Sequence, residues 1–394
     1  MIIMPDSGTT KISDNEIARL RSKLGQVMTV SESPYLTMAT SDSIRRWAMA
    51  TGDRNPLYFA EAGSDDQPEV PPCMLYAFSR LAIGYRGGFP GVHSMFGGSH
   101  WRWYDTLRAG VPVTAETRFD DLIELHGKFA GRMFRQVSLT TFHLPGQSAP
   151  AAEVQGWGMR VERQAARNRE KYQPPQNPGY TAADLRRIGE EYSTEFVRGA
   201  TLLHCEDVRP GERIPSVVRG PYTATTAIAF EQAWGGLFIR AHGYWFDLLR
   251  DHPALGISNS YGIPEPPEAV HWDSQLARSV GVPEAYDYGP ERIAWIATML
   301  TNWIGNDGFL EELYCEVRRF NLIGDLTHCH AQVTEIQCDP SASYGRVRLR
   351  VWADNQRNET TAQGWAWVRL PSRPGPVTSD GRSQAPSVTT TRSL

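Results

Sequence analysis

The stretch ATGDRNPLY, residues 50–58, is the most informative part of this chain. It follows a helix-like segment that begins at Ser41. Much later, VHWD at residues 270–273 is part of a second, incomplete version of the same surroundings. Two related segments at a wide spacing in one chain indicate a duplicated structural unit.

The repeat extends to the predicted strands of each half. The first half closes with QGWGMRV at 155–161 and the second with QGWAWVR at 363–369. Each closing string follows a strand-like run, at 134–142 in the first half and at 347–353 in the second. Before these runs, residues 113–125 and 327–336 alternate between apolar and polar side chains, which is the period of a half-buried strand.

Each half also contains one long apolar segment with helical spacing. In the first half it is Met74 to Tyr85, after two prolines, and in the second it is Pro290 to Ile304. Pro290 suits a first helical turn, where its missing N–H costs nothing. One long helix and three or four antiparallel strands, twice over, predict a duplicated α+β fold.

The domain boundaries follow from composition. We expect disordered ends at 1–12 and 373–394, a first half at 13–161, a linker at 162–198 and a second half at 199–372.

Two features modify this division. Thr181 followed by Asp184 is a capping box, which predicts a short helix in the linker as far as about Tyr192. After a helix-like segment at 224–234, the second half inserts about thirty residues, roughly 236–270, and a loop of that length typically serves as a lid or pocket wall.

The bulk composition is that of an ordinary globular protein. The 394 residues are 41% hydrophobic and 21% charged, and their net charge of −4 argues against a nucleic-acid partner. The five cysteines are scattered without a CxxC pair, so we expect no disulfide framework and a reducing cytoplasm. No apolar run is long enough for a membrane span, and the N-terminus does not have the pattern of a signal peptide.

The stretch at 50–58 resembles the catalytic segment of the MaoC-like (R)-specific enoyl-CoA hydratases and dehydratases, Gly-Asp-x-Asn-Pro-x-His. The resemblance covers about 40–160, as a FAS1-like dehydratase N-terminal half, and about 200–371. It implies a double hotdog fold, in which a long central helix in each half is wrapped by an antiparallel sheet. It also implies acid and base catalysis on an acyl thioester, with acyl-CoA as the expected form and no metal or redox cofactor, in a homodimer or larger homo-oligomer.

In the first half, Asp53, Asn55 and Pro56 match the family segment, but Tyr58 stands in the place of the histidine. Tyrosine has a solution pKa near ~10 and is a much poorer base than histidine at neutral pH. By the resemblance, Asp53 and Tyr58 are candidate catalytic residues and Asn55 a candidate substrate contact. The alternative is that Asp53 caps a turn and Tyr58 fills a vacant pocket.

In the second half, His271-Trp272-Asp273 matches the end of the family segment, so His271 is the best catalytic candidate and Trp272 a candidate substrate contact. Pro266 stands where the catalytic aspartate is expected. The alternative for His271 is a histidine hydrogen-bonded within the inserted loop. We do not expect His271 and Asp53 to form one composite site.

Other residues near His271 could complete a site. The missing carboxylate could come from Glu265, Glu268 or Asp287. The resemblance makes Gly289, at the start of the central helix, the backbone donor to the thioester carbonyl. Arg292 could pair with Asp287 or with a carboxylate of the substrate. His328 and His330 share a strand face without a nearby third ligand, so no metal site is expected.

Three functions remain open from the sequence. The first is a hydratase or dehydratase acting on an α,β-unsaturated or 3-hydroxy acyl thioester. The second is a specialised hotdog enzyme that catalyses a cyclisation, isomerisation or elimination on a bulky substrate held by aromatic walls. The third is a non-catalytic acyl-binding partner subunit. The second and third are open because neither half carries the complete segment.

Overall fold

The fold is described from a computed structural model, which covers residues 12–30, 33–59, 67–84, 87–89, 92–126, 132–161, 179–339 and 341–373. The predicted disordered ends lie outside the described residues, except for Ile12 and Arg373 at their inner edges. Residues 162–178 of the predicted linker also lie outside them.

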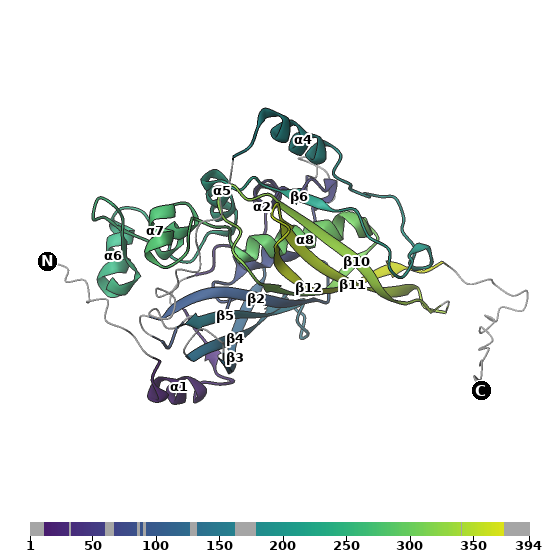
Figure 1. The fold of residues 1–394 in the computed structure, drawn as a ribbon. Coiled ribbons are helices and arrows are strands. Elements are labelled where there is room, and N and C mark those ends of the chain that lie inside the picture. Colours follow the sequence, from purple (N-terminus) through teal and green to yellow (C-terminus); the bar gives the residue numbers. More distant parts are fainter. Residues whose placement is uncertain are drawn as a thin grey trace, which may run out of the picture.

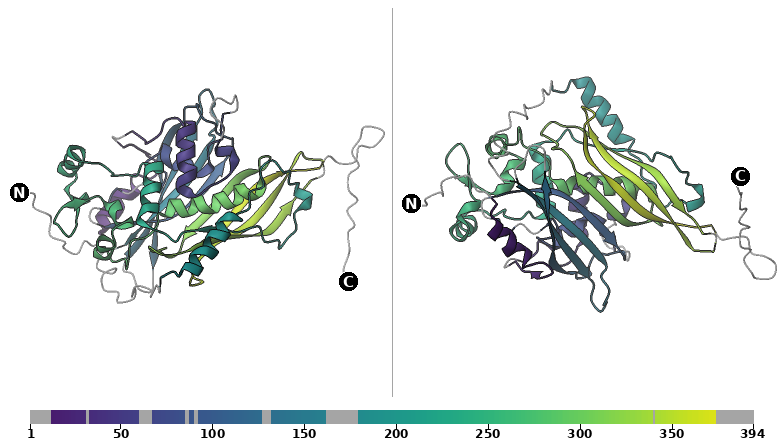
Figure 2. Two further views of the ribbon diagram at one scale, coloured as in Figure 1. Left: turned by 90° about the horizontal axis from the view of Figure 1, so that it is seen from above. Right: turned by 60° about the horizontal axis from the view of Figure 1, so that its bottom comes forward.

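Ten strands of the described residues form one antiparallel sheet in the order β1-β3-β4-β5-β2-β9-β12-β11-β10-β6, and β7 (Ile257–Ser258) and β8 (Pro264–Glu265) form a separate small hairpin. The first half supplies β1 to β5 and the second β6 and β9 to β12, so the two halves meet where β2 pairs with β9. Figures 1 and 2 show the blue strands of the first half continuing into the yellow-green strands of the second. The strands are β1 Val27–Met28, β2 His93–Trp103, β3 Thr114–His126, β4 Arg132–His143, β5 Ala152–Val161, β6 Val217–Arg219, β9 Phe309–Val317, β10 Thr327–Gln337, β11 Tyr344–Asn355 and β12 Thr360–Pro371.

The order of the long strands repeats in mirror image on the two sides of the β2–β9 contact. The strands predicted from alternation and from the closing strings are confirmed as β3, β4, β5, β10, β11 and β12. Along β10 and β11, buried side chains alternate with more exposed ones, because one face covers the core and the other meets solvent. The duplicated α+β architecture predicted from the sequence is therefore confirmed.

The central helix of the second half, α8, spans Gly289–Ile304 and confirms the predicted segment 290–304. Pro290 lies in the first turn of α8, and nearly all side chains of the helix are buried. Figures 1 and 2 show α8 running along the inner side of the sheet. Because it is apolar on almost every side, α8 belongs to the interior of the molecule.

The prediction of a long helix at 74–85 is wrong. Up to Gly84, where the described residues stop short of Tyr85, the segment contains only the 3-10 helix η2, Pro72–Phe78, and the chain is extended at Ser79. Every side chain from Cys73 to Phe78 is buried. Since a segment buried on all sides has no polar face to reveal its period, its apolar composition could not distinguish a short 3-10 turn from a long α-helix.

Two further helices lead into the segments that matter for function. Helix α2, Ser41–Thr51, starts with a capping box between Thr40 and Ser43 and ends at Gly52, which has φ 72°. Helix α5, Ala224–Trp234, ends in the same way at Gly235, which has φ 87°. The two helices pack against each other, with the rings of Trp47 and Phe230 5.6 Å apart.

The remaining elements are peripheral. Helix α1 is Asp14–Arg21, and the predicted linker helix is confirmed as α4, Ala182–Ser193, with the capping box of Thr181 and Asp184. The insertion folds into its own elements at one end of the molecule (Figure 1), followed by η5, Pro267–His271, and α7, Ser274–Ser279. Those elements are α6 Gly243–Asp251, η4 Pro253–Leu255, β7 Ile257–Ser258 and β8 Pro264–Glu265.

The main hydrophobic core is shared by the two halves. It joins residues of α2 and η2 to residues of α5, α8 and the second-half strands in one cluster. The Trp234 indole N–H donates to the Tyr76 carbonyl across the two halves at 3.2 Å. The halves therefore form a single packed body. No helix in the described part of the chain is both long and apolar enough to cross a membrane.

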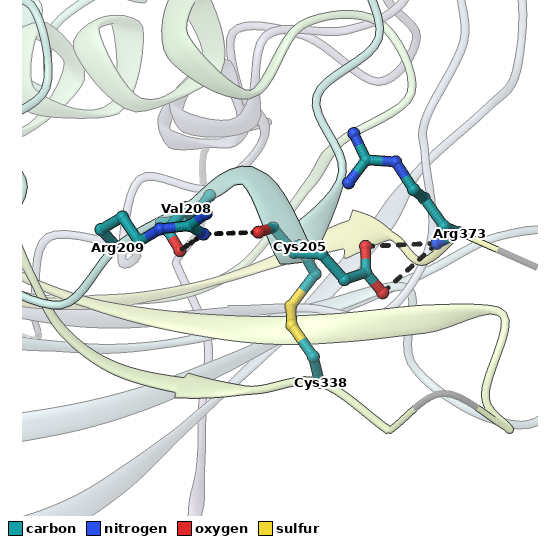
Figure 3. Close-up of a disulfide and its surroundings, with 6 residues drawn as sticks. Cys205, Val208, Arg209, Cys338 and Arg373 are labelled. Carbon is teal, nitrogen blue, oxygen red and sulfur yellow. Dashed lines mark hydrogen bonds between the residues drawn. A yellow bond between two sulfur atoms is a disulfide. The ribbon is translucent and has the colours of Figure 1, made fainter. Parts of the chain in front are cut away.

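The cysteines correct a prediction. Cys205, in the 3-10 helix η3 (Cys205–Asp207), forms a disulfide with Cys338, which follows β10 (Figure 3). The pair is 133 residues apart in sequence, so spacing gave no sign of it. The other three cysteines are buried free thiols. The cysteine pattern therefore no longer supports a reducing compartment.

Candidate functional site

The two family-like segments end in the same local structure. Asn55 caps the 3-10 helix η1, Pro56–Tyr58, by accepting the Leu57 N–H, and Tyr58 is its last residue. His271 is likewise the last residue of η5. Each segment is thus a short 3-10 turn with an aromatic or imidazole ring at its end.

Asp53 is buried and held from both sides. One of its carboxylate oxygens accepts the backbone N–H of Asn55 at 3.0 Å, and the other accepts the Thr298 hydroxyl of α8 at 2.9 Å. Burial raises the pKa of Asp53, and these two hydrogen bonds oppose the rise. Asp53 therefore ties the end of α2 to the central helix of the other half.

Tyr58 and Asn55 border a small cleft at the C-terminal end of α8. Tyr58 is only 4% exposed, and burial raises its phenol pKa well above the ordinary value, so the phenol keeps its proton at neutral pH and cannot act as a base. The side-chain amide nitrogen of Asn55 is buried and makes no hydrogen bond within the described structure. The cleft holds about 90 Å³ and is lined by Asn55, Leu57, Tyr58, Glu69, Val70, Pro71, Pro72, Leu75, Trp103, Asp105, Thr106, Leu107, Thr301, Ile304, Gly305, Asn306, Gly308, Phe309 and Leu310.

His271 is half-buried and oriented by a backbone carbonyl. Its Nδ1 lies 2.7 Å from the Tyr286 carbonyl oxygen. Because a carbonyl can only accept, Nδ1 carries the proton and Nε2 is the basic nitrogen of the neutral ring. The imidazole also contacts the rings of Tyr286 and Tyr288, with centroids 4.6 and 3.7 Å away.

The candidate partners of His271 lie in three different places. Glu265 accepts the Asn259 side-chain N–H at 3.1 Å, within the hairpin of the insertion. Glu268 is 6% exposed and accepts the backbone N–H groups of Leu237 and Phe238 at 3.1 and 3.0 Å. Glu268 thus fastens η5 to the start of the insertion.

The third candidate, Asp287, forms a fully buried ion pair with Arg292. Asp287 was one of the two partners predicted for Arg292. The same guanidinium donates to the carbonyls of Arg319 and Thr361 at 2.7 and 2.8 Å. Burial raises the pKa of Asp287, and the Arg292 charge opposes the rise. Both side chains are occupied in joining the start of α8 to the sheet.

Gly289 and Trp272 are placed as follows. Gly289 is the first residue of α8, as predicted, and a Cβ there would lie 2.2 Å from the Phe96 ring, so only glycine fits. Trp272 follows η5 and packs against a small apolar cluster that contains Val270 and Leu276. The roles of Gly289 as a backbone donor and of Trp272 as a substrate contact stay predictions.

Sequence reasoning missed two residues, Tyr288 against the His271 ring and Glu231 next to Tyr288. Glu231, on α5, is 8% exposed, and burial together with the Glu268 carboxylate raises its pKa to about 8. Tyr288 is 3% exposed, and its hydroxyl is the neighbour that opposes the rise in the Glu231 pKa. The available signals were a glutamate in the apolar run AIAFEQAW and a tyrosine directly before Gly289.

The comparisons with known proteins agree with this architecture. Residues 26–142 match the family model described as the FAS1-like dehydratase domain region. A structure described as a MaoC-like dehydratase has a TM-score of 0.57 and 12% sequence identity, over 90% of this chain and 100% of the other. A conserved hypothetical protein of Mycobacterium tuberculosis, described as having a double hotdog fold, has a TM-score of 0.51 and 11% identity, over 88% and 96%.

This chain has the double hotdog fold. A MaoC-domain dehydratase structure from Chloroflexus aurantiacus gives the same picture, with a TM-score of 0.52 and 14% identity over 89% of this chain and 96% of the other. At these identities the structural likeness establishes the fold alone. A search of curated sequences found no significant match.

In this double hotdog the two family-like segments lie near different ends of α8. His271 contacts Tyr288, at the start of the helix, and Asp53 bonds Thr298, ten residues later. At 1.5 Å per residue these points are ~15 Å apart along the axis. The structure therefore does not bring Asp53 and His271 together.

The described residues contain no group of three side chains that could hold a metal ion. His328 instead pairs with Glu191 of α4 at 2.8 Å, and His330 lies against the ring of Trp352. Both histidines of that strand therefore have protein partners.

Proposed function

We propose that this double hotdog protein is a hydro-lyase, which hydrates an α,β-unsaturated acyl thioester or dehydrates the 3-hydroxy form, with CoA as the carrier. Two observations support the reaction class. Residues 26–142 match a dehydratase family model, and the fold is shared with proteins described as dehydratases. The proposed chemistry uses protein side chains and needs no metal or redox cofactor.

The observation that carries the proposal is the orientation of His271. The Tyr286 carbonyl fixes the proton on Nδ1, so Nε2 can take a proton from water. The water oxygen then bonds to the β-carbon of the substrate as the double bond opens. Positioned proton transfer of this kind contributes about 100- to 10,000-fold to a rate.

A helix N-terminus close to His271 suits the thioester carbonyl. Helix α8 begins at Gly289, and the backbone N–H groups of its first turn carry the positive end of the helix dipole. In the proposed mechanism the Gly289 N–H donates to the thioester oxygen and stabilises the negative charge that develops there.

The first half has a different role in this proposal. Asp53 is held by Thr298 and Asn55, and Tyr58 has too high a pKa to activate water at neutral pH. The cleft beside Tyr58 would then bind part of the substrate without reacting with it.

The test is hydration of crotonyl-CoA and cinnamoyl-CoA, followed by loss of enone absorbance. We expect His271→Ala to lower kcat/KM by roughly 100-fold or more, because the base is lost. Asp53→Ala should retain most of the activity of the folded protein. His252→Ala, at an exposed position in the insertion, is the matched control and should match the wild type.

Loss of activity in Asp53→Ala alone, with normal folding, would move the working site to the first half. A wild type that hydrates neither thioester would contradict the proposal and favour another reaction or a binding role.

A further inference from the structure

Glu231 is an acidic residue enclosed in the double hotdog interior with an unusual set of neighbours. It projects from α5, a helix whose other buried residues are apolar or aromatic. Neither carboxylate oxygen makes a well-aligned hydrogen bond within the described structure. A buried carboxylate without strong partners is costly, so the side chain is most stable with a proton on it.

The fit around Glu231 is close. A Cβ on Gly236 would lie 2.3 Å from one Glu231 oxygen, and Gly236 has φ +58°, so glycine is required there for two reasons. The Gly236 and Leu237 carbonyls accept hydrogen bonds from Arg80 of the first half. The backbone that covers Glu231 is thus fixed from both halves.

Burial and a second carboxylate, that of Glu268 from η5, favour the protonated form of Glu231. Tyr288, from the start of α8, faces Glu231 with a hydroxyl that opposes this rise, and burial raises the pKa of the Tyr288 phenol itself well above its usual range. Arg80 directs its guanidinium to backbone carbonyls, and His271 stacks on Tyr288 at 3.7 Å.

We propose that Tyr288 and Glu231 form the proton-donating side of the site, with the Tyr288 hydroxyl protonating the substrate α-carbon and Glu231 replacing that proton. This role rests on the hydratase function proposed above. The three groups are then neighbours in one site, with the His271 ring against the Tyr288 ring and the Tyr288 hydroxyl facing the Glu231 carboxyl.

The proposed step balances in atoms and electrons. His271 Nε2 takes a proton from water, and the water oxygen forms a bond to the β-carbon. The π electrons of the C=C bond form the new C–H bond at the α-carbon with the Tyr288 proton, and the Glu231 proton moves to the phenolate oxygen. His271 ends protonated and Glu231 ionised, and solvent returns the proton from one to the other.

The raised pKa of Glu231, about 8, supports this division of roles. At neutral pH Glu231 holds its proton, as a donor must, and His271 with its Nδ1 proton fixed is the acceptor. The wild-type kcat/KM for hydration should therefore fall above about pH 8, as Glu231 ionises.

The experiment compares pH profiles of kcat/KM for crotonyl-CoA in the wild type, Glu231→Gln and Tyr288→Phe. Glutamine has nearly the shape of glutamate but no acidic proton to give. For Glu231→Gln we therefore expect kcat/KM to drop roughly tenfold or more and to lose the fall above pH 8 that Glu231 causes. Tyr288→Phe should lose roughly 100-fold. Glu190→Gln, on the exposed side of α4, is the matched control and should match the wild type.

A second readout does not depend on activity. The buried Glu291 carboxyl also has a raised pKa, so the Glu231 band is taken from the wild type minus Glu231→Gln infrared difference spectrum. A protonated-carboxyl band should be present in that difference at neutral pH and disappear above about pH 8. If Glu231→Gln does not fold, Tyr288→Phe and the wild-type pH profile still decide the question.

The outcomes separate the two proposals. An active wild type with an unchanged Glu231→Gln profile, or a neutral-pH spectrum without the Glu231 band, overturns the donor role and leaves the hydratase function standing. A wild type that is inactive on both thioesters overturns the hydratase function, and the donor role with it.

Discussion

Glu231 lies on α5 with only 8% of its surface exposed, and its charge state sets a pH dependence of stability. Its pKa is about 8 in the folded protein against an ordinary 4.5, so the folded state holds the proton more tightly. The stability that this proton contributes is complete below about pH 4.5 and is lost as the pH rises to about 8.

Glu231→Gln removes this dependence because the amide does not titrate. We expect its free energy of unfolding, relative to the wild type, to increase from about pH 5 to about pH 8, measured by urea unfolding at each pH. The exposed substitution Glu190→Gln should produce no comparable trend. A constant difference between Glu231→Gln and the wild type would show that Glu231 is not protonated in the folded state.

At the scale of elements, the junction between α5 and the insertion depends on Gly236. Alanine there must adopt φ +58° and place its Cβ against Glu231, so we expect Gly236→Ala to destabilise the protein by more than the ~1 kcal/mol that positive φ alone costs. Because the Glu231 carboxyl would be displaced, the variant should also lose activity in the hydration assay.

Gly262→Ala is the matched control for this prediction. Gly262 also lies in the insertion with φ +73°, but nothing lies within 4 Å of an added Cβ. The difference in unfolding free energy between the two variants therefore isolates the contact with Glu231. Equal losses in both variants would mean that the junction can move aside.

At the scale of the whole molecule, one disulfide closes a long loop of the chain. The Cys205–Cys338 bond joins residues 133 apart, and cross-links of this kind usually stabilise a protein by about 2–4 kcal/mol through the unfolded state. We expect a reducing agent to lower the thermal midpoint of the wild type.

The double variant Cys205→Ser/Cys338→Ser should begin at the lower midpoint and should not respond to the reducing agent. The three buried free thiols are present in both proteins, so they cannot account for a difference between them. A wild-type midpoint that is insensitive to full reduction would contradict a stabilising role of the bond.

Local patterns in the sequence were sufficient for much of the architecture. Alternation predicted β3 and β10, the capping box of Thr181 and Asp184 predicted α4, and the segment after Pro290 predicted α8. These predictions succeeded because each depends on neighbours a few residues away, where strand or helix periodicity is visible. The family resemblance, carried mainly by residues 50–58, also predicted the double hotdog fold.

Other features depend on residues that only folding brings together. The pKa of Glu231 depends on Glu268 and Tyr288, which come from different elements, and the disulfide joins distant loops. The segment after Pro72 forms only a short 3-10 helix in a fully buried place. The sequence by itself determined the fold class and the position of His271 in a family-like segment. Only the tertiary structure decided its neighbours, because desolvation and hydrogen bonding depend on distances in space and not on spacing along the chain.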